Sequence, residues 1–161
     1  MEKLFLALWL AMLAVTSGEG GPFGLSELQK KTVDSIVNDF NSNPKQQHAH
    51  KMASVRSKEE HVMSEGKTVT LEFILRPTIC KKEKFQPEKC PYRIGRWQVC
   101  VACFKYDDDV NPQTLDKFWD CIPLRSHTTE RKKQQQQKCE DVKTEQEPMI
   151  GVFSFLKSGP D

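Results

Sequence analysis

The sequence predicts an α+β domain in which one N-terminal helix packs across a curved antiparallel sheet. Three observations lead to this class. An amphipathic helical pattern lies in the first third of the chain, alternating strand patterns follow it, and six cysteines, an even number, lie in the second half. The predicted organisation is a signal peptide at residues 1–18, one domain at residues 19–145 and a flexible C-terminal tail at residues 146–161.

Residues 1–18 show the pattern of a secretory signal peptide. Lys3 is followed by an apolar run from Leu4 to Val15, and small residues follow that run. The run is too short to cross a bilayer as a helix, which takes about 20 residues. A basic start, a short apolar centre and a small-residue end are features of a segment that is removed on export. We expect cleavage within Ser17–Gly20 and a secreted, extracellular protein; the alternative is a buried helix of the mature fold.

The charges of the chain are nearly balanced. There are 24 basic and 22 acidic side chains, with a net charge of +2. A nucleic-acid-binding domain shows a strongly basic face, so we expect no nucleic-acid partner. The chain has no second long apolar run, and we expect no stable membrane insertion. About 140 residues remain after the signal peptide, a normal size for one domain, and we expect a monomer.

The segment GLSELQKKTVDSIVNDFNSNP predicts the helix. Ser26 is a suitable N-cap, and Gln29 three residues later completes a capping box. The apolar side chains then recur at i, i+3, i+4 and i+7, which makes one buried face: Leu25, Leu28, Val33, Ile36, Val37 and Phe40. Asn41, Asn43 and Pro44 end the helix.

Strand patterns follow the helix in order. Thr68–Leu75 alternates apolar and polar side chains, Arg96–Lys105 and Phe118–Leu124 are two further strands, and Lys51–Met63 shows a weaker pattern. Asp107–Pro112 reads as a turn or loop. The run RKKQQQQK, residues 131–138, is interpreted as solvated and low in complexity.

The cysteines predict structural disulfides: they are Cys80, Cys90, Cys100, Cys103, Cys121 and Cys139. Cys80 and Cys90 bracket a short polar loop, which favours their mutual pairing. Cys100 and Cys103 lie three apart in a strand, on opposite faces and about 10 Å apart, whereas a disulfide needs Cα atoms within about 7 Å. Each therefore pairs with Cys121 or Cys139, and either assignment is possible. The alternative is redox or zinc chemistry at the CxxC.

No constellation of catalytic or metal-binding residues is present. The histidines are His48, His50, His61 and His127, and no acid or cysteine lies at a ligand spacing from the HxH pair. GxSxG, HExxH and P-loop patterns are absent, and Asp107–Asp109 lacks the glycine and glutamate of an EF-hand loop. We expect no enzyme activity, no metal and no cofactor.

Basic side chains dominate the segment Cys80–Lys105, where Glu83 and Glu88 are the acidic ones. The basic side chains are Lys81, Lys82, Lys84, Lys89, Arg93, Arg96 and Lys105. Such a patch can bind heparin-like glycans or acidic surfaces. The alternative is an ordinary solvated face.

Four segments of the chain resemble the chemerin family, which sits in the cystatin and cathelicidin-prodomain structural group. The helix GLSELQKKTVDSIVNDFNSNP resembles the opening helix of the family. VTLEFILRPTICKKEKFQPEKC is similar to its LEF strand and first cysteine pair, and CVACFK to its C-x-A-C-x-K strand. GVFSFLKS resembles the family's tail. Together the segments extend over nearly the whole chain.

The resemblance implies the cystatin-like form of the fold and a function. The implied disulfides are Cys80–Cys90, Cys100–Cys121 and Cys103–Cys139. The implied function is that of a secreted chemoattractant and adipokine precursor, activated by C-terminal proteolysis. Its partner is a chemokine-like G-protein-coupled receptor that acts in inflammation, immune-cell chemotaxis and adipocyte and metabolic regulation.

The residues of the implied activating segment are Pro148, Met149, Ile150, Gly151, Val152, Phe153, Ser154, Phe155 and Leu156. Phe153 and Phe155 are its aromatic anchors. The processing enzymes are extracellular serine proteases and carboxypeptidases, which act around Leu156, Lys157 and Ser158. A trypsin-like enzyme cuts after Lys157, a carboxypeptidase then removes that lysine, and an elastase-like enzyme cuts near Leu156.

Two alternative functions follow from the same structural group. One is an antimicrobial host-defence protein similar to the cathelicidins, with its activity in the basic Cys80–Lys105 segment because the tail is short and nearly neutral. The other is a cystatin-type cysteine-protease inhibitor. The QxVxG hairpin of such inhibitors has no match in the corresponding residues 50–66, so this alternative is the weaker one.

Overall fold

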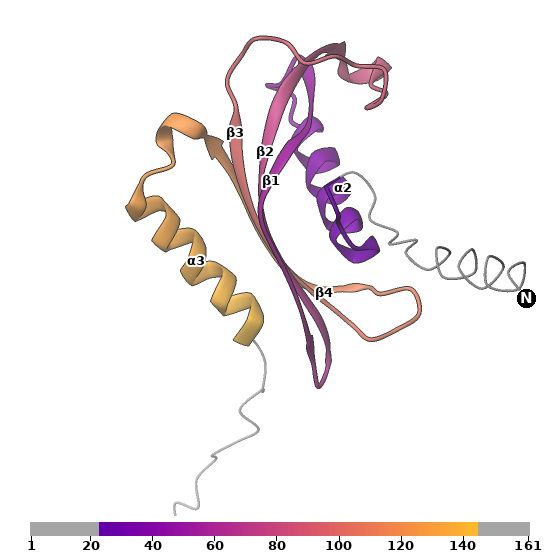
Figure 1. The fold of residues 1–161 in the computed structure, drawn as a ribbon, viewed down its shortest axis with the longest axis vertical. Helices are drawn as coiled ribbons and strands as arrows, with labels where there is room; N and C mark the ends of the chain where they lie inside the picture. The colour runs from indigo at the N-terminus through magenta and orange to yellow at the C-terminus, as the bar shows by residue number, and fades with distance from the viewer. Residues whose placement is uncertain (1–22, 145–161) are drawn as a thin grey trace, which may run out of the picture.

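The computed structural model describes residues 23–144. In chain order the elements are α2 (Glu27–Asn41), β1 (His48–Met63), β2 (Gly66–Lys81), the 3₁₀ turn η2 (Lys82–Lys84), β3 (Gln98–Tyr106), β4 (Thr114–Pro123), the 3₁₀ turn η3 (Leu124–Ser126) and α3 (Thr129–Thr144). The four strands form one antiparallel sheet in the order β1-β2-β3-β4. α2 lies across one face of this curved sheet and α3 lies on the other (Figure 1). The predicted α+β class, with an N-terminal helix across an antiparallel sheet, is confirmed.

The sequence features of α2 act as predicted. The backbone N–H of Gln29 donates to Ser26 Oγ at 3.2 Å, and the backbone N–H of Ser26 donates to Gln29 Oε1 at 3.1 Å. This capping box satisfies donors that the first turn leaves without an intrahelical partner. The helix ends at Asn41, whose side-chain amide then bonds the backbone of His50 in both directions. The end of α2 is thereby attached to the start of β1.

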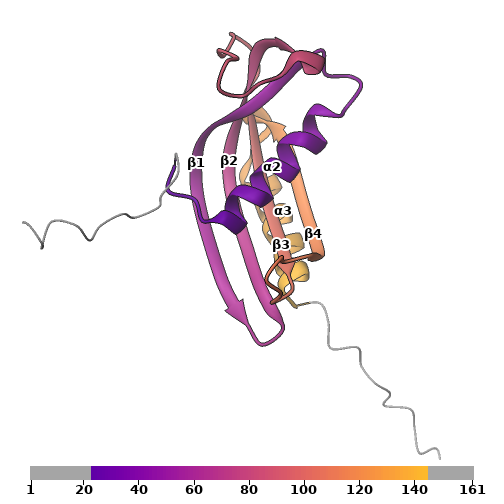
Figure 2. The same ribbon diagram turned by 90° about the vertical axis from the view of Figure 1, so that its right-hand side faces the viewer.

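The core lies between α2 and the central strands; Figure 2 is viewed from the α2 side and shows this helix in front of the sheet. The side chains that point toward α2 are fully or almost fully buried: Val69, Leu71, Phe73 and Leu75 from β2, and Cys100, Ala102, Phe104 and Tyr106 from β3. Leu25, Val33 and Ile36 cover them from the helix side. The alternating pattern of Thr68–Leu75 therefore predicted the core face of β2 correctly.

β1 and β2 form a long hairpin of two 16-residue strands. β1 is an edge strand, and its second half, residues 56–63, is exposed, which explains the weak apolar pattern there. Gly66 closes the hairpin with φ +135°, and a Cβ at this position would lie 1.9 Å from the carbonyl oxygen of Tyr106. Only glycine fits there, because it alone has neither the steric limit on φ nor a Cβ.

Three disulfides join the framework: Cys80–Cys90, Cys100–Cys121 and Cys103–Cys139, with Cα–Cα distances of 5.8, 4.1 and 5.3 Å. The pairings implied by the family resemblance are confirmed. Cys100 bonds its cross-strand neighbour in β4, and Cys103 bonds α3 on the opposite face. The prediction that the two half-cystines of the CxxC point to opposite faces is therefore also confirmed.

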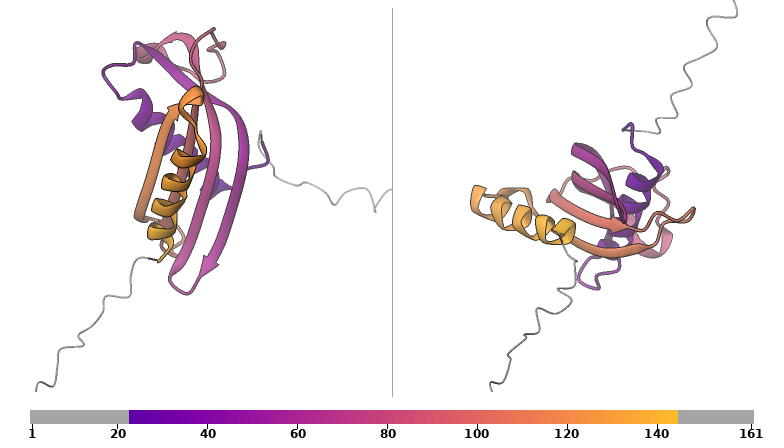
Figure 3. Two further views of the ribbon diagram at one scale, coloured as in Figure 1. Left: turned by 90° about the vertical axis from the view of Figure 1, so that its left-hand side faces the viewer. Right: turned by 90° about the horizontal axis from the view of Figure 1, so that it is seen from below.

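α3 is the main difference from the sequence prediction. Residues 131–138, interpreted as solvated and low in complexity, are exposed for the most part but lie within a 16-residue helix. Because α3 covers the second face of β3, all nine residues of that strand are buried. Figure 3 shows α3 on the face of the sheet opposite α2. The predicted signal peptide at residues 1–18 and tail at residues 146–161 lie outside the described residues.

Candidate functional site

The predicted activating segment, Pro148–Leu156, and the predicted cleavage positions at Leu156, Lys157 and Ser158 lie outside the described residues. The structure describes the part of the domain that precedes them. α3 ends at Thr144, four residues before Pro148. The contacts that hold α3 therefore determine where the segment starts. We call the sheet residues that hold this helix, Val101, Cys103, Phe118 and Asp120, the α3 platform.

A narrow stripe of three side chains attaches α3 to its platform. Gln135, Cys139 and Val142 follow the i, i+4, i+7 spacing of one helix face and are only 2%, 4% and 5% exposed. Cys139 and Val142 form a buried cluster with Val101 and Cys103, and Phe118 packs against it. The helix has no apolar residue besides Cys139 and Val142, and the Cys103–Cys139 disulfide is its covalent bond to the sheet.

Polar contacts fix the first half of α3. Thr128 Oγ1 accepts from the backbone N–H of Arg131 at 3.3 Å, which is the geometry of an N-cap. Asp120 Oδ2 accepts from Arg131 Nη2 and from Gln135 Nε2, each at 3.0 Å. Gln135 is nearly inaccessible, so its bond to the carboxylate matters more than the half-exposed ion pair. These contacts set the direction in which the helix runs over the sheet.

The end of α3 at Thr144 sets the chain length between the described domain and the predicted activating segment. Twelve residues, 145–156, separate the end of α3 from the predicted cut after Leu156. A fully extended chain of this length spans about 40 Å. Phe153 and Phe155, the predicted anchors, lie outside the described residues, and no disulfide loop encloses them.

The sequence did not predict the polar contacts between α3 and its platform. Asp120, Arg131 and Gln135 were not singled out, because α3 is very polar and its central run reads as low in complexity. Two signals were available. Thr128 precedes the helix as a cap, and Gln135, Cys139 and Val142 have helical spacing around a cysteine that must be paired.

The two histidines of the HxH pair have different surroundings. His50 is 6% exposed, its ring meets the Phe40 ring edge-on at 5.0 Å between centroids, and its Nδ1 lies 3.2 Å from the carbonyl oxygen of His48. Burial lowers the pKa of His50 below its usual value. His48 Nδ1 faces Arg93 Nη1 at 2.9 Å. Among residues 23–144, no group of three or more His, Cys, Asp and Glu side chains has a geometry that would hold a metal ion.

The β1–β2 turn is the place where a cystatin-type inhibitor would carry its QxVxG motif. Here the turn joins Met63 to Gly66 and contains Glu65, whose carboxylate lies 3.8 Å from Lys105 Nζ. Lys105 itself is only 8% exposed. The turn is thus a charged, glycine-closed hairpin that pairs back onto β3, and its sequence lacks the inhibitory motif.

The fold and its bonds define a disulfide-stabilised α+β domain with a chain segment that continues past the last tethered helix. Comparison with known proteins identifies similar proteins that share one name. The chain is 34% identical over 103 residues to retinoic acid receptor responder protein 2 of Cricetulus griseus, which covers 63% of this chain and 61% of that protein. It is 29% identical over 161 residues to the Homo sapiens protein of that name, covering 96% of this chain and 94% of the relative.

Five curated relatives bear this name, which is the name of chemerin, and they confirm the resemblance to the chemerin family. The alignments to the Cricetulus griseus and Mus musculus proteins span 61% and 62% of those relatives. No protein-family model matches the chain.

Two solved structures are similar in shape at low identity. The crystal structure of Al-CPI has a TM-score of 0.45 and 16% identity, covering 62% of this chain and 92% of that one. The crystal structure of dimeric human cystatin F has a TM-score of 0.47 and 14% identity, covering 63% and 83%. We draw no functional inference from these two likenesses.

Proposed function

We propose that this protein is a secreted, non-enzymatic chemoattractant and adipokine precursor. C-terminal proteolysis would activate it toward a chemokine-like G-protein-coupled receptor in inflammation, immune-cell chemotaxis and adipocyte and metabolic regulation. The observation that supports this proposal is the position of the apolar segment Pro148–Leu156. It follows a helix that is tethered by a disulfide, and it lies outside all three disulfide loops. The chemerin relatives support the same reading.

Extracellular localisation fits the covalent framework. Every cysteine of the chain is disulfide-bonded in the structure, and stable disulfides are typical of oxidising compartments. In the part of the chain from residue 23 to residue 144, no helix is long and apolar enough to span a membrane. The proposed signal peptide at residues 1–18 would direct export.

The physical basis of activation is burial of the two aromatic anchors in a receptor pocket. Phe153 and Phe155 offer large apolar surfaces at low cost in side-chain entropy, as binding hot spots do. Lys157 and the residues after it would bring a charge into a pocket of limited depth. An unpaired buried charge costs several kcal/mol, and about 1.4 kcal/mol is a tenfold change in affinity. Removal of the residues after Leu156 would therefore raise receptor affinity by orders of magnitude.

Synthetic peptides test this proposal directly. In cells that express the receptor, a peptide of residues 148–156 should be more potent than one of residues 148–161 by about 100-fold or more. The matched control is the short peptide with Phe155→Ala, which should lose most of its activity because a buried aromatic anchor is removed. Equal potency of the short and long peptides would contradict the masking role of residues 157–161.

Sulfated glycans are a second proposed class of partner, from the basic character of the Cys80–Lys105 segment. Host-defence activity is the alternative function for the same segment. Lys81, Lys84 and Lys89 are exposed there, which an antimicrobial role requires. A bacterial killing assay with a peptide of residues 80–105 and one of residues 148–161 distinguishes the two locations, and inactivity of both removes this alternative.

A further inference from the structure

Three adjoining hollows lie on the surface at the end of the molecule where β1 begins and β4 ends. The first, of about 530 Å³, is lined by the loop before β1 and by Lys81 and Lys82. The second, of about 600 Å³, includes Lys45 and Arg93. The third, of about 610 Å³, includes Arg125. We call this surface the basic track.

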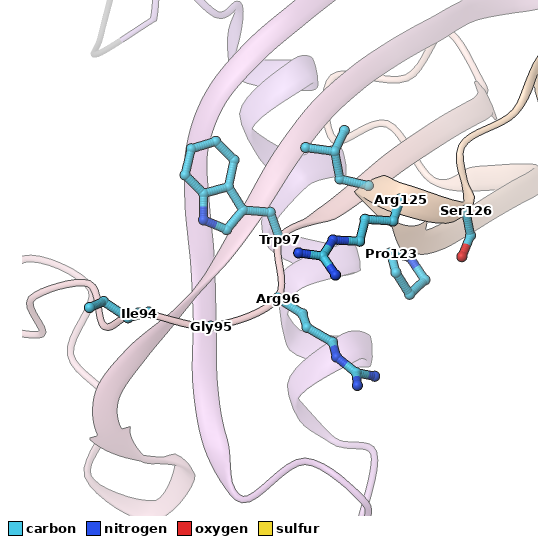
Figure 4. Close-up of a pocket in the computed structure, with 8 residues that line it drawn as sticks. Ile94, Gly95, Arg96, Trp97, Pro123, Arg125 and Ser126 are labelled. Atoms are coloured by element: carbon cyan, nitrogen blue, oxygen red, sulfur yellow. The ribbon is translucent and has the colours of Figure 1, made fainter.

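The hollows are connected because neighbouring ones share lining residues. Gln46, Gln47 and His48 line both the first and the second hollow. Gly95, Arg96 and Pro123 line both the second and the third. Figure 4 shows Arg96 and Arg125 projecting from two different chain segments around the third hollow, with Trp97 at its upper margin. The three hollows therefore adjoin one another, and a long ligand that occupies one can reach the next.

Charge on the basic track is strongly one-sided. Its basic side chains are Lys45, Lys81, Lys82, Arg93, Arg96 and Arg125, and Glu83 at one end is the single carboxylate among the lining residues. The chain as a whole carries 24 basic and 22 acidic residues. Folding therefore concentrates positive charge on this surface, although the net charge of the whole chain is close to zero.

The track differs from the patch that the sequence predicted. Lys45 and Arg125 join it from outside the Cys80–Lys105 segment. Lys105, which the sequence placed in the patch, is buried in β3 and pairs with Glu65 at the β1–β2 turn. Lys84 and Lys89 do not line any of the three hollows. The structural site and the sequence segment are thus distinguishable by mutation.

Several bonds hold the segments of the track in place. Arg93 donates its backbone N–H to the carbonyl oxygen of Pro77 at 2.9 Å, and its guanidinium Nη1 lies 2.9 Å from His48 Nδ1. Lys82 Nζ donates to the carbonyl oxygen of Asn43 at 2.8 Å. The backbone N–H of Leu124 donates to the carbonyl oxygen of Trp97 at 2.9 Å, which joins the segment of Arg96 to that of Arg125. A surface arranged before binding loses less entropy when the ligand arrives.

We infer that the basic track binds a linear sulfated polysaccharide of the heparan sulfate class. Sulfate groups complement the guanidinium and ammonium groups, and amide side chains such as Gln46 and Gln47 can donate to sugar hydroxyls and carboxylates. The ring of Trp97, 42% exposed, offers an apolar surface beside the charges. The spread of the six basic side chains over three adjoining hollows favours an extended polymer over a compact anion. This inference gives a site to the glycan partner proposed above, and it is independent of receptor activation.

The glycan site and the C-terminal site lie at opposite ends of α3. The helix begins shortly after Ser126, which lines the third hollow, and runs away from it (Figure 1). Sixteen residues of helix span about 24 Å. A glycan bound in the track therefore leaves the end of α3 accessible, so the protein can be retained on a cell surface while its C-terminal segment is processed.

Heparin-affinity chromatography and surface plasmon resonance on immobilised heparan sulfate test the inference. The test variant is K45Q/R96Q/R125Q, in which three charges leave the track and none of the hydrogen bonds described above is lost. The matched control is K84Q/K89Q/K133Q, which loses the same charge outside the track, with two of its positions in the Cys80–Lys105 segment. The test variant should bind about tenfold more weakly or worse, and the control within about twofold of the unmodified protein.

The outcomes separate the possibilities. A loss of heparan sulfate binding in the test variant alone supports the track. The affinity of the unmodified protein should also fall as the salt concentration increases. An equal loss of heparan sulfate affinity in both variants overturns the inference, because binding would then depend on the overall charge of the protein and not on the track. Binding of unsulfated hyaluronan or of poly-glutamate as strong as that of heparan sulfate overturns the choice of a sulfated glycan. Receptor assays on the same variants keep this result apart from the proposed signalling function, because none of the mutated residues belongs to the C-terminal segment.

Discussion

The Cys103–Cys139 disulfide should contribute more to holding α3 than the noncovalent contacts of that helix do. The bond closes a loop with a sequence separation of 36 residues, and the chain-entropy relation assigns such a cross-link about 4 kcal/mol at 25 °C. Without it, α3 keeps mainly Val142, Gln135 and the Asp120 contacts. A 16-residue helix is marginal in water when it lacks tertiary support, so C103A/C139A should release α3 from the sheet while α2 and the sheet stay folded.

Urea unfolding and amide hydrogen exchange measure this effect. The free energy of unfolding should fall by about 4 kcal/mol, and the backbone amides of α3 should lose their protection first. The matched control is C80A/C90A, whose separation of 10 residues corresponds to about 3 kcal/mol and which leaves the α3 platform intact. If α3 keeps its protection in C103A/C139A and the free energy of unfolding drops by less than about 1 kcal/mol, the disulfide is not the main tether.

Three further predictions concern the sheet, the buried histidine and the platform. Gly66→Ala should lower the free energy of unfolding by about 1–3 kcal/mol, because φ is positive and the new Cβ meets Tyr106; Ser64→Ala in the same turn should change it by less than about 0.5 kcal/mol. The pKa of buried His50 is lowered, so the unfolded chain binds the proton more readily than the folded chain does. The free energy of unfolding should therefore decrease as pH falls below the unfolded pKa of 6.5. Urea midpoints between pH 7.5 and 5 should fall less in His50→Asn than in the exposed control His61→Asn. Asp120→Ala leaves Gln135 Nε2 without its partner and should cost about 1–3 kcal/mol in denaturant unfolding, against almost nothing for exposed Asp109→Ala; equal costs would remove the role of Asp120 in the platform.

Elements whose local pattern agrees with their final environment were predicted from the sequence. α2 has a capping box and a continuous apolar stripe, and β2 alternates around the core. The alternating pattern of β1 was weaker because half of this edge strand is exposed. α3 was missed because its helix is held by one disulfide and two other buried side chains, Gln135 and Val142, rather than by an apolar face.

The sites depended on information that is not local. Residue spacing indicated that Cys100 and Cys103 point to opposite faces of a strand, but the choice between Cys121 and Cys139 came from the family resemblance. The sequence predicted only part of the basic track: Lys81, Lys82, Arg93 and Arg96 belong to the Cys80–Lys105 segment, whereas Lys45 and Arg125 come from outside it. Charge clusters of this kind are made by tertiary structure, and a linear scan finds only the part that is contiguous.

The potency of the whole domain-containing chain with defined C-termini tests the proposed function most directly. Three forms that end at Leu156, Lys157 and Asp161 share the same domain and disulfides and differ only in the residues after the aromatic anchors. Receptor activation should be strongest for the form ending at Leu156, weaker for Lys157 and lowest for Asp161, with about 100-fold or more between the first and the last. Equal potency of the three forms would show that the residues after Leu156 do not mask the anchors, and would contradict activation by C-terminal proteolysis.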